Sequence, residues 1–363
     1  EERAHSERLA ALIRAEIARA GGVLDFARYM ELALYAPGLG YYSAGTTKFG
    51  AAGDFVTAPE LGFVFARCLA RALLPELRDG GEIVELGPGS GALAAELLLE
   101  LERLGALPAR YRLLERSADL RARQRETLHR RCAHLLDRIA WLDAPPVAPW
   151  RGALVANEVI DALPVRAFAW RDEGLFARAV GVDDGGNFIW REVEAEPDLQ
   201  AALARAIQPS ALSPQPYLSE ICPLLDPWLA EVTRSLELGS AWFVDYGCAH
   251  GEYYAAARHT GTLRCHYRHR AHDDPLILPG LQDITAWVDF DALARAGEAA
   301  GLSVAAHTTQ AQFLIANGLD EVFAQGYAEA ADEAARYALA QQVKRLTLPG
   351  EMGEKFRVMV LRR

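Results

Sequence analysis

Lysine is scarce in this 363-residue sequence, where the 38 basic residues include only Lys48, Lys344 and Lys355. Acidic residues number 49, so the formal net charge is −11. A negative surface repels nucleic-acid phosphates and anionic lipid headgroups. The composition therefore argues against a nucleic-acid-binding or membrane-binding protein and leaves room only for a local basic patch.

Cysteine is also scarce, and its pattern disfavours two further classes of protein. The five cysteines are odd in number, scattered and without a C-x-x-C pair, which disfavours a disulfide framework and a cysteine-rich zinc site. No run approaches the 18 apolar residues of a membrane-spanning helix. We expect a soluble cytoplasmic protein, or a mitochondrial one only if a targeting segment has been removed.

The first part of the chain has helical periodicity, at residues 6–20 and 24–34. Residues 35–60 then form a stretch rich in glycine and aromatic side chains that lacks regular periodicity. Such a stretch is too long for an idle connection. We expect it to be a lid that orders over a bound cofactor, within an N-terminal helical and lid segment covering residues 1–80.

From residue 82 the pattern alternates between strands and helices. Four strands are expected first, at 82–86, 111–115, 139–143 and 152–158. Helices are expected between them, at 91–105 and 118–132. This rhythm predicts an α/β fold with a parallel, Rossmann-like doubly wound sheet. Three later strands complete an expected seven-stranded sheet in a domain covering residues 81–363, at 240–247, 302–309 and 355–363.

Antiparallel insertions interrupt this scheme. Three runs alternate without helices between them, at 165–170, 174–182 and 187–195. The Asp-Asp-Gly-Gly sequence at 183–186 predicts a β-hairpin turn between the second and third runs. We expect insertions into the main domain at about residues 165–235 and 250–288.

A glycine-rich turn follows the first strand of the alternating region and opens a helix. Its glycines are Gly87, Gly89 and Gly91, and Glu85 precedes them at the strand end. Glycines permit a tight turn and let a ligand lie against backbone N–H groups. The spacing differs from the dinucleotide fingerprint, and a carboxylate here would repel a pyrophosphate but suit an amine-bearing or cationic ligand. The alternative is a turn that needs positive φ without binding anything.

Two acidic residues end the next strands. Glu115 ends the second strand, where doubly wound sites place the carboxylate that holds ribose hydroxyls; the alternative is a solvated residue before a helix. Asp143 ends the third strand and either meets an adenine amino group or belongs to the turn before Pro145. With the glycine turn, these residues predict S-adenosylmethionine as cofactor in preference to NAD.

Blocks of distinctive sequence run through nearly the whole chain. They read GDFVTAPE at 53–60, ELGPGSG at 85–91, NEVIDALPV at 157–165, GTLRCHYRHR at 261–270, PGLQDIT at 279–285 and GEKF at 353–356. Together they resemble the MidA family of class I S-adenosylmethionine-dependent methyltransferases. Trp287 departs from the family pattern, in which a smaller polar residue or histidine is expected.

The resemblance implies a class I methyltransferase fold and a protein as methyl acceptor. Mitochondrial members of the family are protein arginine methyltransferases that act on a respiratory complex I subunit during assembly. A respiratory complex subunit is therefore one candidate partner. Neither the motifs nor the resemblance predicts the oligomeric state.

An arginine acceptor requires carboxylates, because a guanidinium stays charged and must be oriented and polarised. Glu158 and Asp161 follow Asn157 at the end of the fourth strand, where open α/β sheets bind ligands. Three residues apart, the two carboxylates would share one side of a helical turn. We expect both to be catalytic and Asn157 to contact the cofactor. The alternative is that Asn157 and Asp161 cap a short helix.

Two further segments carry expected site residues. Thr57, Pro59 and Glu60 form a helix start whose N–H groups could meet the methionine carboxylate of the cofactor; the resemblance favours this function over a surface loop. Asp245 ends the fifth strand on the ligand edge of the sheet and is expected to contact substrate. A strand-ending turn is the alternative for Asp245.

Histidines gather within the second insertion, at residues 259, 266, 269 and 272. A metal site is not expected there, because the histidine spacing matches no closed zinc site and neighbouring arginines would repel a cation. The resemblance favours a loop that faces the substrate, and a solvated basic loop is the alternative. The residues assigned to this substrate loop are His259, His266, His269 and Asp283.

Two functions compete with methyl transfer. A catalytically silent assembly factor that binds S-adenosylmethionine would keep every motif except the need for Glu158 and Asp161. A NAD-dependent oxidoreductase is disfavoured by the glycine spacing.

Overall fold

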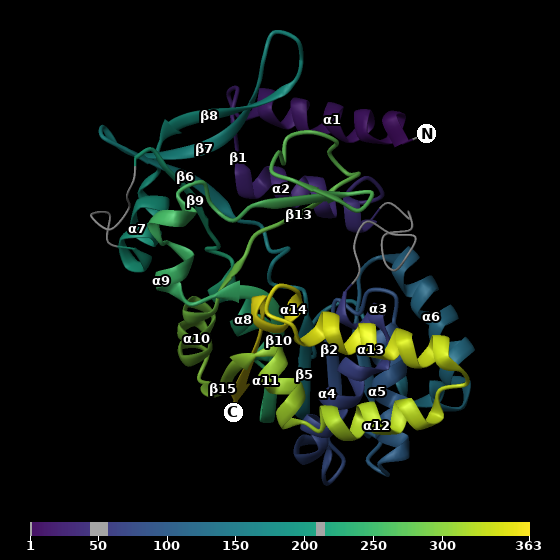
Figure 1. The fold of residues 1–363 in the computed structure, drawn as a ribbon. Helices are drawn as coiled ribbons and strands as arrows, with labels where there is room; N and C mark the ends of the chain where they lie inside the picture. The colour runs from purple at the N-terminus through teal and green to yellow at the C-terminus, as the bar shows by residue number, and fades with distance from the viewer. Residues whose placement is uncertain (1, 44–56, 208–214) are drawn as a thin grey trace. The chain divides into compact units, whose positions relative to one another are not determined.

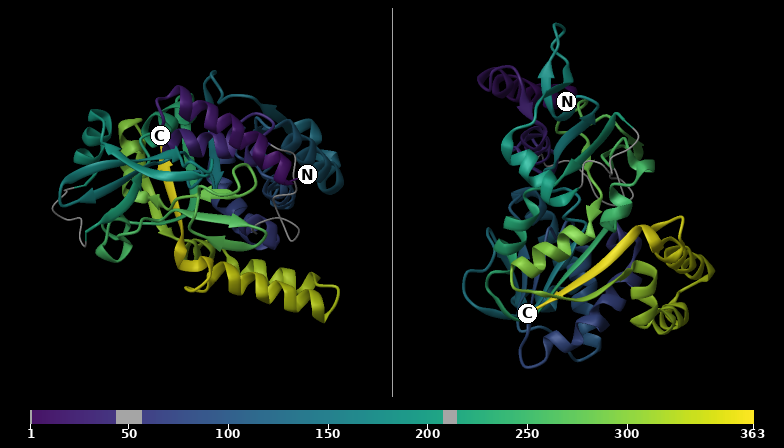
Figure 2. Two further views of the ribbon diagram at one scale, coloured as in Figure 1. Left: turned by 90° about the horizontal axis from the view of Figure 1, so that it is seen from above. Right: turned by 90° about the vertical axis from the view of Figure 1, so that its left-hand side faces the viewer.

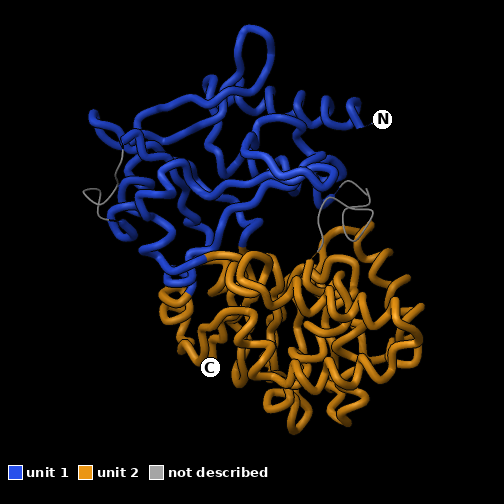
Figure 3. The backbone as a smooth tube through the Cα atoms, viewed as in Figure 1, with its two compact units in different colours: residues 1–47, 161–226, 248–293 blue, residues 48–160, 227–247, 294–363 orange. Residues whose placement is uncertain are grey.

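The computed structural model describes residues 2–43, 57–207 and 215–363. The chain divides into two compact units (Figure 3). Unit 1 comprises Glu1–Thr47, Asp161–Asp226 and Cys248–Leu293, and unit 2 comprises Lys48–Ile160, Pro227–Gly247 and Ala294–Arg363. Most of the expected lid, residues 44–56, lies outside the described residues.

Unit 2 is built on a large sheet whose main path has seven strands (Figure 1). Their order is β15 (Ser303–Thr309), β16 (Phe356–Arg362), β10 (Leu236–Cys248), β5 (Trp150–Asn157), β2 (Glu82–Leu86), β3 (Tyr111–Leu114) and β4 (Ile139–Leu142). The five strands from β10 to β4 are parallel to their neighbours, whereas β16 runs antiparallel to both β10 and β15. An eighth, two-residue strand, β14 (Val288–Asp289), lies off this path. The predicted Rossmann-like α/β class is confirmed.

Helices cover the parallel strands because such strands are apolar on both faces. In β5, for example, the side chains from Ala153 to Val155 are fully buried. The helices that follow or precede the parallel strands are α3 (Ala58–Leu61), α4 (Phe63–Leu77), α5 (Ala92–Arg103), α6 (Ala118–Cys132) and η2 (Ala133–Arg138). The core includes Phe65, Leu97 and Tyr111, from α4, α5 and β3.

Four helices between β15 and β16 have no counterpart in the sequence analysis. They are α11 (Gln310–Ala316), α12 (Leu319–Glu329), α13 (Glu333–Thr347) and α14 (Met352–Lys355). Helices α12 and α13 lie side by side (Figure 2), and α12 also packs on α4. Their apolar residues Val322, Leu339 and Leu346 join the same core as the sheet.

Unit 1 contains two antiparallel sheets, as the expected insertions require. The first joins β1 (Leu24–Asp25), β7 (Gly174–Val182), β6 (Arg166–Arg171) and β9 (Tyr217–Ile221) in that order, with β8 (Phe188–Glu194) paired to β7. The second joins β12 (Arg270–His272), β11 (Arg264–Tyr267) and β13 (Asp283–Thr285). Its helices are α1 (Glu2–Arg19), α2 (Phe26–Tyr35), η1 (Tyr41–Ser43), α7 (Pro197–Ala206), α9 (His250–Tyr253) and η4 (Ala256–Arg258).

This division differs from the expected boundary at residue 80. Helices α3 and α4 belong to unit 2, because the side chains from Val64 to Leu73 are buried in the core of the large sheet. The first two helices, α1 and α2, instead belong to unit 1 with the insertions. The short strand that separates these helices, β1, pairs with β7 of the first insertion. In the described residues the chain passes between the units after Ile160, within α8 (Leu225–Thr233), after Gly247 and within α10 (Phe290–Ala299).

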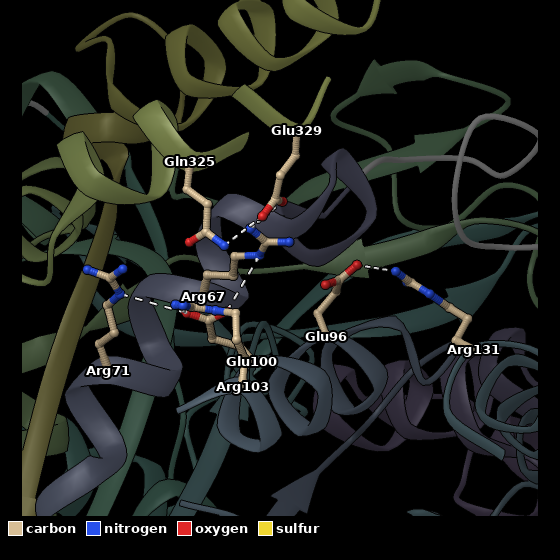
Figure 4. A network of polar contacts seen from close by, with 8 residues as sticks. All are labelled: Arg67, Arg71, Glu96, Glu100, Arg103, Arg131, Gln325 and Glu329. Carbon is tan, nitrogen blue, oxygen red and sulfur yellow. Dashed lines mark hydrogen bonds and ion pairs between the residues drawn. The ribbon is translucent and has the colours of Figure 1, made fainter. Parts of the chain in front are cut away.

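A buried ionic cluster ties the helices of unit 2 together (Figure 4). The Glu100 side chain of α5 is 1% exposed and accepts two hydrogen bonds from Arg103, at 2.6 and 2.8 Å. Arg67 and Arg71 of α4 lie 3.8 Å from its two oxygens. Arg67 also approaches Glu329 of α12 at 3.5 Å. Glu100 is therefore the carboxylate that the three guanidinium groups share, while Arg67 and Arg71 also pair with Glu329 and Glu321.

Replacing Glu100 with glutamine should leave those three charges without their shared partner. We expect Glu100→Gln to lower the free energy of unfolding by about 2–3 kcal/mol, since breaking a buried ion pair is costly and these arginines keep some contact with water. Urea unfolding measures the change. Glu333→Gln, which removes an 85%-exposed partner of Arg336, is the control and should cost less than about 0.5 kcal/mol. Equal losses for the two variants would contradict the assignment.

Candidate active site

The glycine-rich turn lies at the carboxyl end of β2, as predicted, and opens α5. Gly87, Gly89 and Gly91 all have positive φ, at 58°, 52° and 83°. A Cβ atom on Gly87 would lie 3.1 Å from Val159 Cγ2, and one on Gly91 would lie 3.3 Å from Gln124 Cα. The turn therefore needs glycine both for its conformation and for the close approach of two neighbouring segments.

Glu85 is buried beneath this turn. Its side chain is 2% exposed and accepts a hydrogen bond from the Tyr111 hydroxyl at 2.7 Å. Burial raises the pKa of Glu85 to about 7, although the hydrogen bond from Tyr111 acts in the opposite direction. At neutral pH the carboxyl is only partly ionised. The charge that the sequence analysis assigned to Glu85 is thus smaller than a free carboxylate would supply.

Glu115 lies directly after β3, where a ribose-binding carboxylate was predicted. It is partly buried and accepts hydrogen bonds from the Ser117 N–H at 2.8 Å and from Gln124 Nε2 at 3.3 Å. Burial raises the pKa of Glu115, while these hydrogen bonds favour its ionised form. The residue is therefore held in place rather than freely solvated.

Asp143 follows β4 and faces solvent. Its side chain is 89% exposed and pairs with Arg121 Nη2 at 2.7 Å. Arg121 also donates to the backbone carbonyls of Glu115, at 2.6 Å, and Leu142, at 2.8 Å. This pairing favours the turn interpretation of Asp143, and its contact with adenine stays a prediction.

The helix start at Thr57 offers fewer donors than expected. Pro59 has no N–H, and the N–H groups of Glu60 and Leu61 both donate to the Thr57 carbonyl. Of the four residues of α3, this leaves only the N–H of Ala58 for a ligand carboxylate. The Glu60 side chain instead accepts a hydrogen bond from the Ser90 hydroxyl, so it braces the glycine turn.

The segment after β5 has no helical turn, contrary to the expectation for Glu158 and Asp161. Residues 158–164 form bends and turns, and Glu158 has a φ of 53°, in the left-handed region. Asp161 therefore caps no helix here and belongs to unit 1, whereas Glu158 belongs to unit 2. Within unit 2, Asn157 Nδ2 donates to Glu158 Oε1 at 3.1 Å.

Asp245 holds this turn in place. Its buried carboxylate accepts hydrogen bonds from the N–H groups of Val159 and Ile160, at 3.2 and 3.0 Å, and of Tyr246, at 3.0 Å. The Glu158 N–H donates to the neighbouring Val244 carbonyl at 2.8 Å. The bonds from Val159 and Ile160 to Asp245 position the turn that carries Glu158, and the expected contact of Asp245 with substrate stays a prediction.

The remaining predicted residues lie in unit 1. Asp161 is buried, and its carbonyl accepts from the Ala286 N–H at 2.9 Å. Asp283 is buried and accepts from the Tyr42 hydroxyl at 2.9 Å, and it pairs with His266 between β13 and β11. Burial, with Asp283 nearby, raises the pKa of Tyr42. Carboxylate and phenol thus share a buried hydrogen bond.

Two of the three histidines assigned to the substrate loop, His259 and His269, take part in local backbone structure. His269 forms the two-residue turn of the β11–β12 hairpin with Arg268, and both have positive φ, as such turns require. The His259 carbonyl accepts from the Leu218 N–H at 2.7 Å. Within the described parts of the chain, no three His, Cys, Asp or Glu side chains are grouped so as to hold a metal ion.

Sequence reasoning missed four polar residues that brace the site, namely Ser90, Arg121, Gln124 and Trp141. Arg121 and Gln124 are three apart on α6 and so share one face of that helix. The sequence did carry a signal for Gln124. Leu120 and Leu128 mark the buried side of α6, and Gln124 is a polar residue on that side. The arginine-rich composition of α6 obscured it.

The described residues fit S-adenosylmethionine. The glycine turn supplies a backbone cradle, and Glu115 supplies an acceptor for hydroxyl groups. Asn157 Oδ1 is buried and accepts no hydrogen bond from the described residues, so it could receive one from an amine. Fold and site together define a nucleoside-binding α/β protein whose ligand edge is rich in acceptors.

Comparison with known proteins identifies the family. A model of the Methyltransf_28 family, described as S-adenosyl-L-methionine-dependent methyltransferases, matches residues 68–308. The chain belongs to this family, is a methyltransferase, and uses S-adenosylmethionine as its cofactor. The resemblance to MidA proteins is confirmed, and a NAD-dependent oxidoreductase is not supported.

Two crystal structures of Burkholderia thailandensis proteins are similar over nearly the whole chain. One, bound to S-adenosyl-homocysteine, is 43% identical with a TM-score of 0.93, and the match covers 99% of this chain and 93% of that one. The other, a native structure, is 42% identical with a TM-score of 0.90 and covers 99% and 92%.

Curated relatives named "Protein arginine methyltransferase NDUFAF7, mitochondrial" are also similar. The Mus musculus protein is 28% identical over 378 residues, covering 94% of this chain and 81% of the relative. The Homo sapiens protein is 28% identical and covers 94% and 80%. None of the described helices is long and apolar enough to cross a membrane. The cytoplasmic location expected from the sequence stays a prediction.

Glu85 should make stability depend on pH in the cofactor-free protein. Its raised pKa means that the folded protein retains a proton that the unfolded chain releases above about pH 4.5. This contribution is complete below pH 4.5 and is lost as pH rises toward 7. Between pH 5 and 7, wild type should therefore lose about 2–3 kcal/mol relative to Glu85→Gln, measured by urea unfolding at each pH. A pH-independent difference between the two proteins would contradict this assignment.

Tyr111→Phe provides a matched check. It removes the hydrogen bond that favours ionised Glu85, so the loss of stability should extend to higher pH than in wild type. An unchanged pH window would show that Tyr111 does not act on Glu85.

Proposed function

We propose that this methyltransferase transfers a methyl group to arginine on a partner protein and that Glu158 binds the acceptor guanidinium. The names of the curated relatives support arginine on a protein as acceptor. A respiratory complex subunit stays the candidate partner implied by the family resemblance. The cytoplasm stays the proposed location.

One observation carries the proposal. The turn that bears Glu158 lies against the glycine turn, since a Cβ atom on Gly87 would be only 3.1 Å from Val159 Cγ2. Glu158 is held there in a left-handed conformation that few residues other than glycine adopt. A strained charged residue beside a cofactor turn is well suited to a reactive site.

The cofactor, when bound, supplies a methyl group that is electrophilic because its sulfur is positively charged. The chain itself needs only to bind and aim the nucleophile. The Glu158 carboxylate can accept hydrogen bonds from guanidinium nitrogens and draw positive charge toward them. The nitrogen that accepts the methyl group then carries less of that charge. Asp245 keeps Glu158 in place through its bonds to Val159 and Ile160.

Glu158→Gln tests this role. The amide keeps the size of the side chain but loses the charge-assisted bond to the guanidinium, so methyl transfer to an acceptor arginine should slow by about 100-fold or more. Cofactor affinity should change little, because Glu158 is assigned to the acceptor. Initial rates with labelled cofactor measure transfer, and calorimetry measures affinity. Glu237→Gln, at an exposed position of β10, is the control and should behave as wild type.

Two outcomes would contradict the proposal. Full transfer by Glu158→Gln to a verified acceptor would remove the carboxylate mechanism. Absence of any methylated arginine in co-purifying proteins from producing cells, with cofactor binding intact, would favour the silent assembly factor.

Asp245→Asn tests positioning separately from binding. An asparagine oxygen can accept fewer and weaker bonds, so the left-handed turn should loosen and kcat should fall by about 10-fold or more while the KM for cofactor changes less than twofold. A purely structural role would lower thermal stability without this kinetic split. The pH profile of kcat should keep its wild-type shape, since Asp245 transfers no proton in this scheme.

A further inference from the structure

Gln124 of α6 is completely buried, yet no part of the proposed reaction uses it. Its side chain bonds to three separate segments. Nε2 donates to the Gly89 carbonyl at 3.0 Å and to Glu115 Oε2 at 3.3 Å. Oε1 accepts from Trp141 Nε1 at 2.9 Å. One carboxamide therefore uses both of its N–H donors and its oxygen.

These three partners belong to consecutive parallel strands. Gly89 lies in the turn after β2, Glu115 directly follows β3, and Trp141 lies in β4. The carboxyl ends of parallel strands share one edge of a sheet, which is where nucleoside cofactors bind in this fold class. Through its three hydrogen bonds, the Gln124 side chain connects these segments at that edge of the sheet.

The orientation of the carboxamide is determined by Trp141. An indole N–H can only donate, so the oxygen of Gln124 must face Trp141 and the nitrogen must face Glu115 and Gly89. The reverse orientation would set two donors against each other and bring the oxygen against the Glu115 carboxylate. Arg125 lies over the Trp141 ring, 4.7 Å from its centroid, and restrains that ring in turn.

We propose that Gln124 is a positioning residue for the cofactor, fixing the Glu115 carboxylate relative to the glycine turn so that both meet the adenosine half of S-adenosylmethionine. The Gln124 N–H donates to Glu115 Oε2, and the N–H of Ser117, the residue that caps α6, donates to Oε1, so both carboxylate oxygens are held in place. Close packing of Gly91 against Gln124 Cα, where an added Cβ would lie at 3.3 Å, holds the helix at the required distance. This inference requires cofactor binding but not an arginine acceptor.

Gln124→Glu provides the sharpest test. The variant keeps an oxygen for Trp141 but replaces the donor that faces Glu115 and Gly89 with a second carboxylate oxygen. At pH 8 repulsion should weaken binding of S-adenosyl-homocysteine by about 10-fold or more. As pH falls toward 5.5 the new carboxyl takes up a proton and can donate again, so affinity should recover toward the wild-type value. Calorimetric titration at each pH measures this.

A matched control separates positioning from general loss of packing. Gln310 of α11 is also completely buried in unit 2 and donates to a backbone carbonyl, that of Leu346, at 3.0 Å. Gln124→Ala and Gln310→Ala should both lower the melting temperature. Gln124→Ala alone should also weaken S-adenosyl-homocysteine binding about 10-fold and change the fluorescence of Trp141, compared with Trp141→Phe as a blank.

Three results would overturn the proposal. They are wild-type affinity in Gln124→Ala, an equal loss of affinity in Gln310→Ala, and a loss in Gln124→Glu that does not depend on pH. Each is read from binding to the purified protein. Failure of the arginine proposal would leave these measurements unchanged, so the two can be told apart.

Discussion

The shared edge formed by the parallel strands is the constraint on which the site depends. Strands β4, β3, β2, β5 and β10 run in one direction, so each ends beside its neighbours. Backbone bonds hold the strands and the first residues of the loops that follow them, such as Gly87, Glu115 and Glu158. Those loops are also fixed by side chains: Ser90 with Glu60, Gln124 with Glu115, and Asp245 with Val159 and Ile160. The sheet therefore determines where the site lies, and these side-chain bonds determine the conformation of its loops.

Buried carboxylates in unit 2 differ in how their charge is balanced. Glu100 faces three arginines, and Asp245 accepts three backbone N–H groups. Glu85 accepts a hydrogen bond from the Tyr111 hydroxyl within the described part of the chain, and its pKa rises to about 7. For Glu85, burial raises the pKa, and a single hydroxyl donor offsets that effect only in part. Glu115, whose pKa burial also raises, differs from Glu85 in having several hydrogen-bond donors that favour its ionised form.

Periodicity predicted β2, β3, β4 and β5 to within one or two residues, because each is a short apolar run bounded by turn signals, whereas β10 begins four residues before its predicted start. It did not predict the four helices between β15 and β16, because it assigns their apolar positions to the connection between two strands. Nor did it predict the conformation of Glu158. Spacing alone suggested a helical turn, but the positive φ of Glu158 depends on Asp245, 86 residues beyond Val159 in the chain. Gln124 was missed for a similar reason, since only its three distant partners distinguish it from an ordinary polar residue on a helix.

The hydrogen bonds of Asp245 also lie close to points at which the chain passes between its two units. The chain leaves unit 2 directly after Ile160 and again after Gly247. Asp245 lies two residues before the second crossing and bonds to the N–H groups of Val159 and Ile160 at the first. One carboxylate near the second crossing thus bonds to the chain at the first, and Glu158 directly follows the end of β5 and precedes the two residues that donate to Asp245. If Glu158 binds the acceptor as proposed, its backbone is anchored to the sheet of unit 2 through Val244 and Asp245.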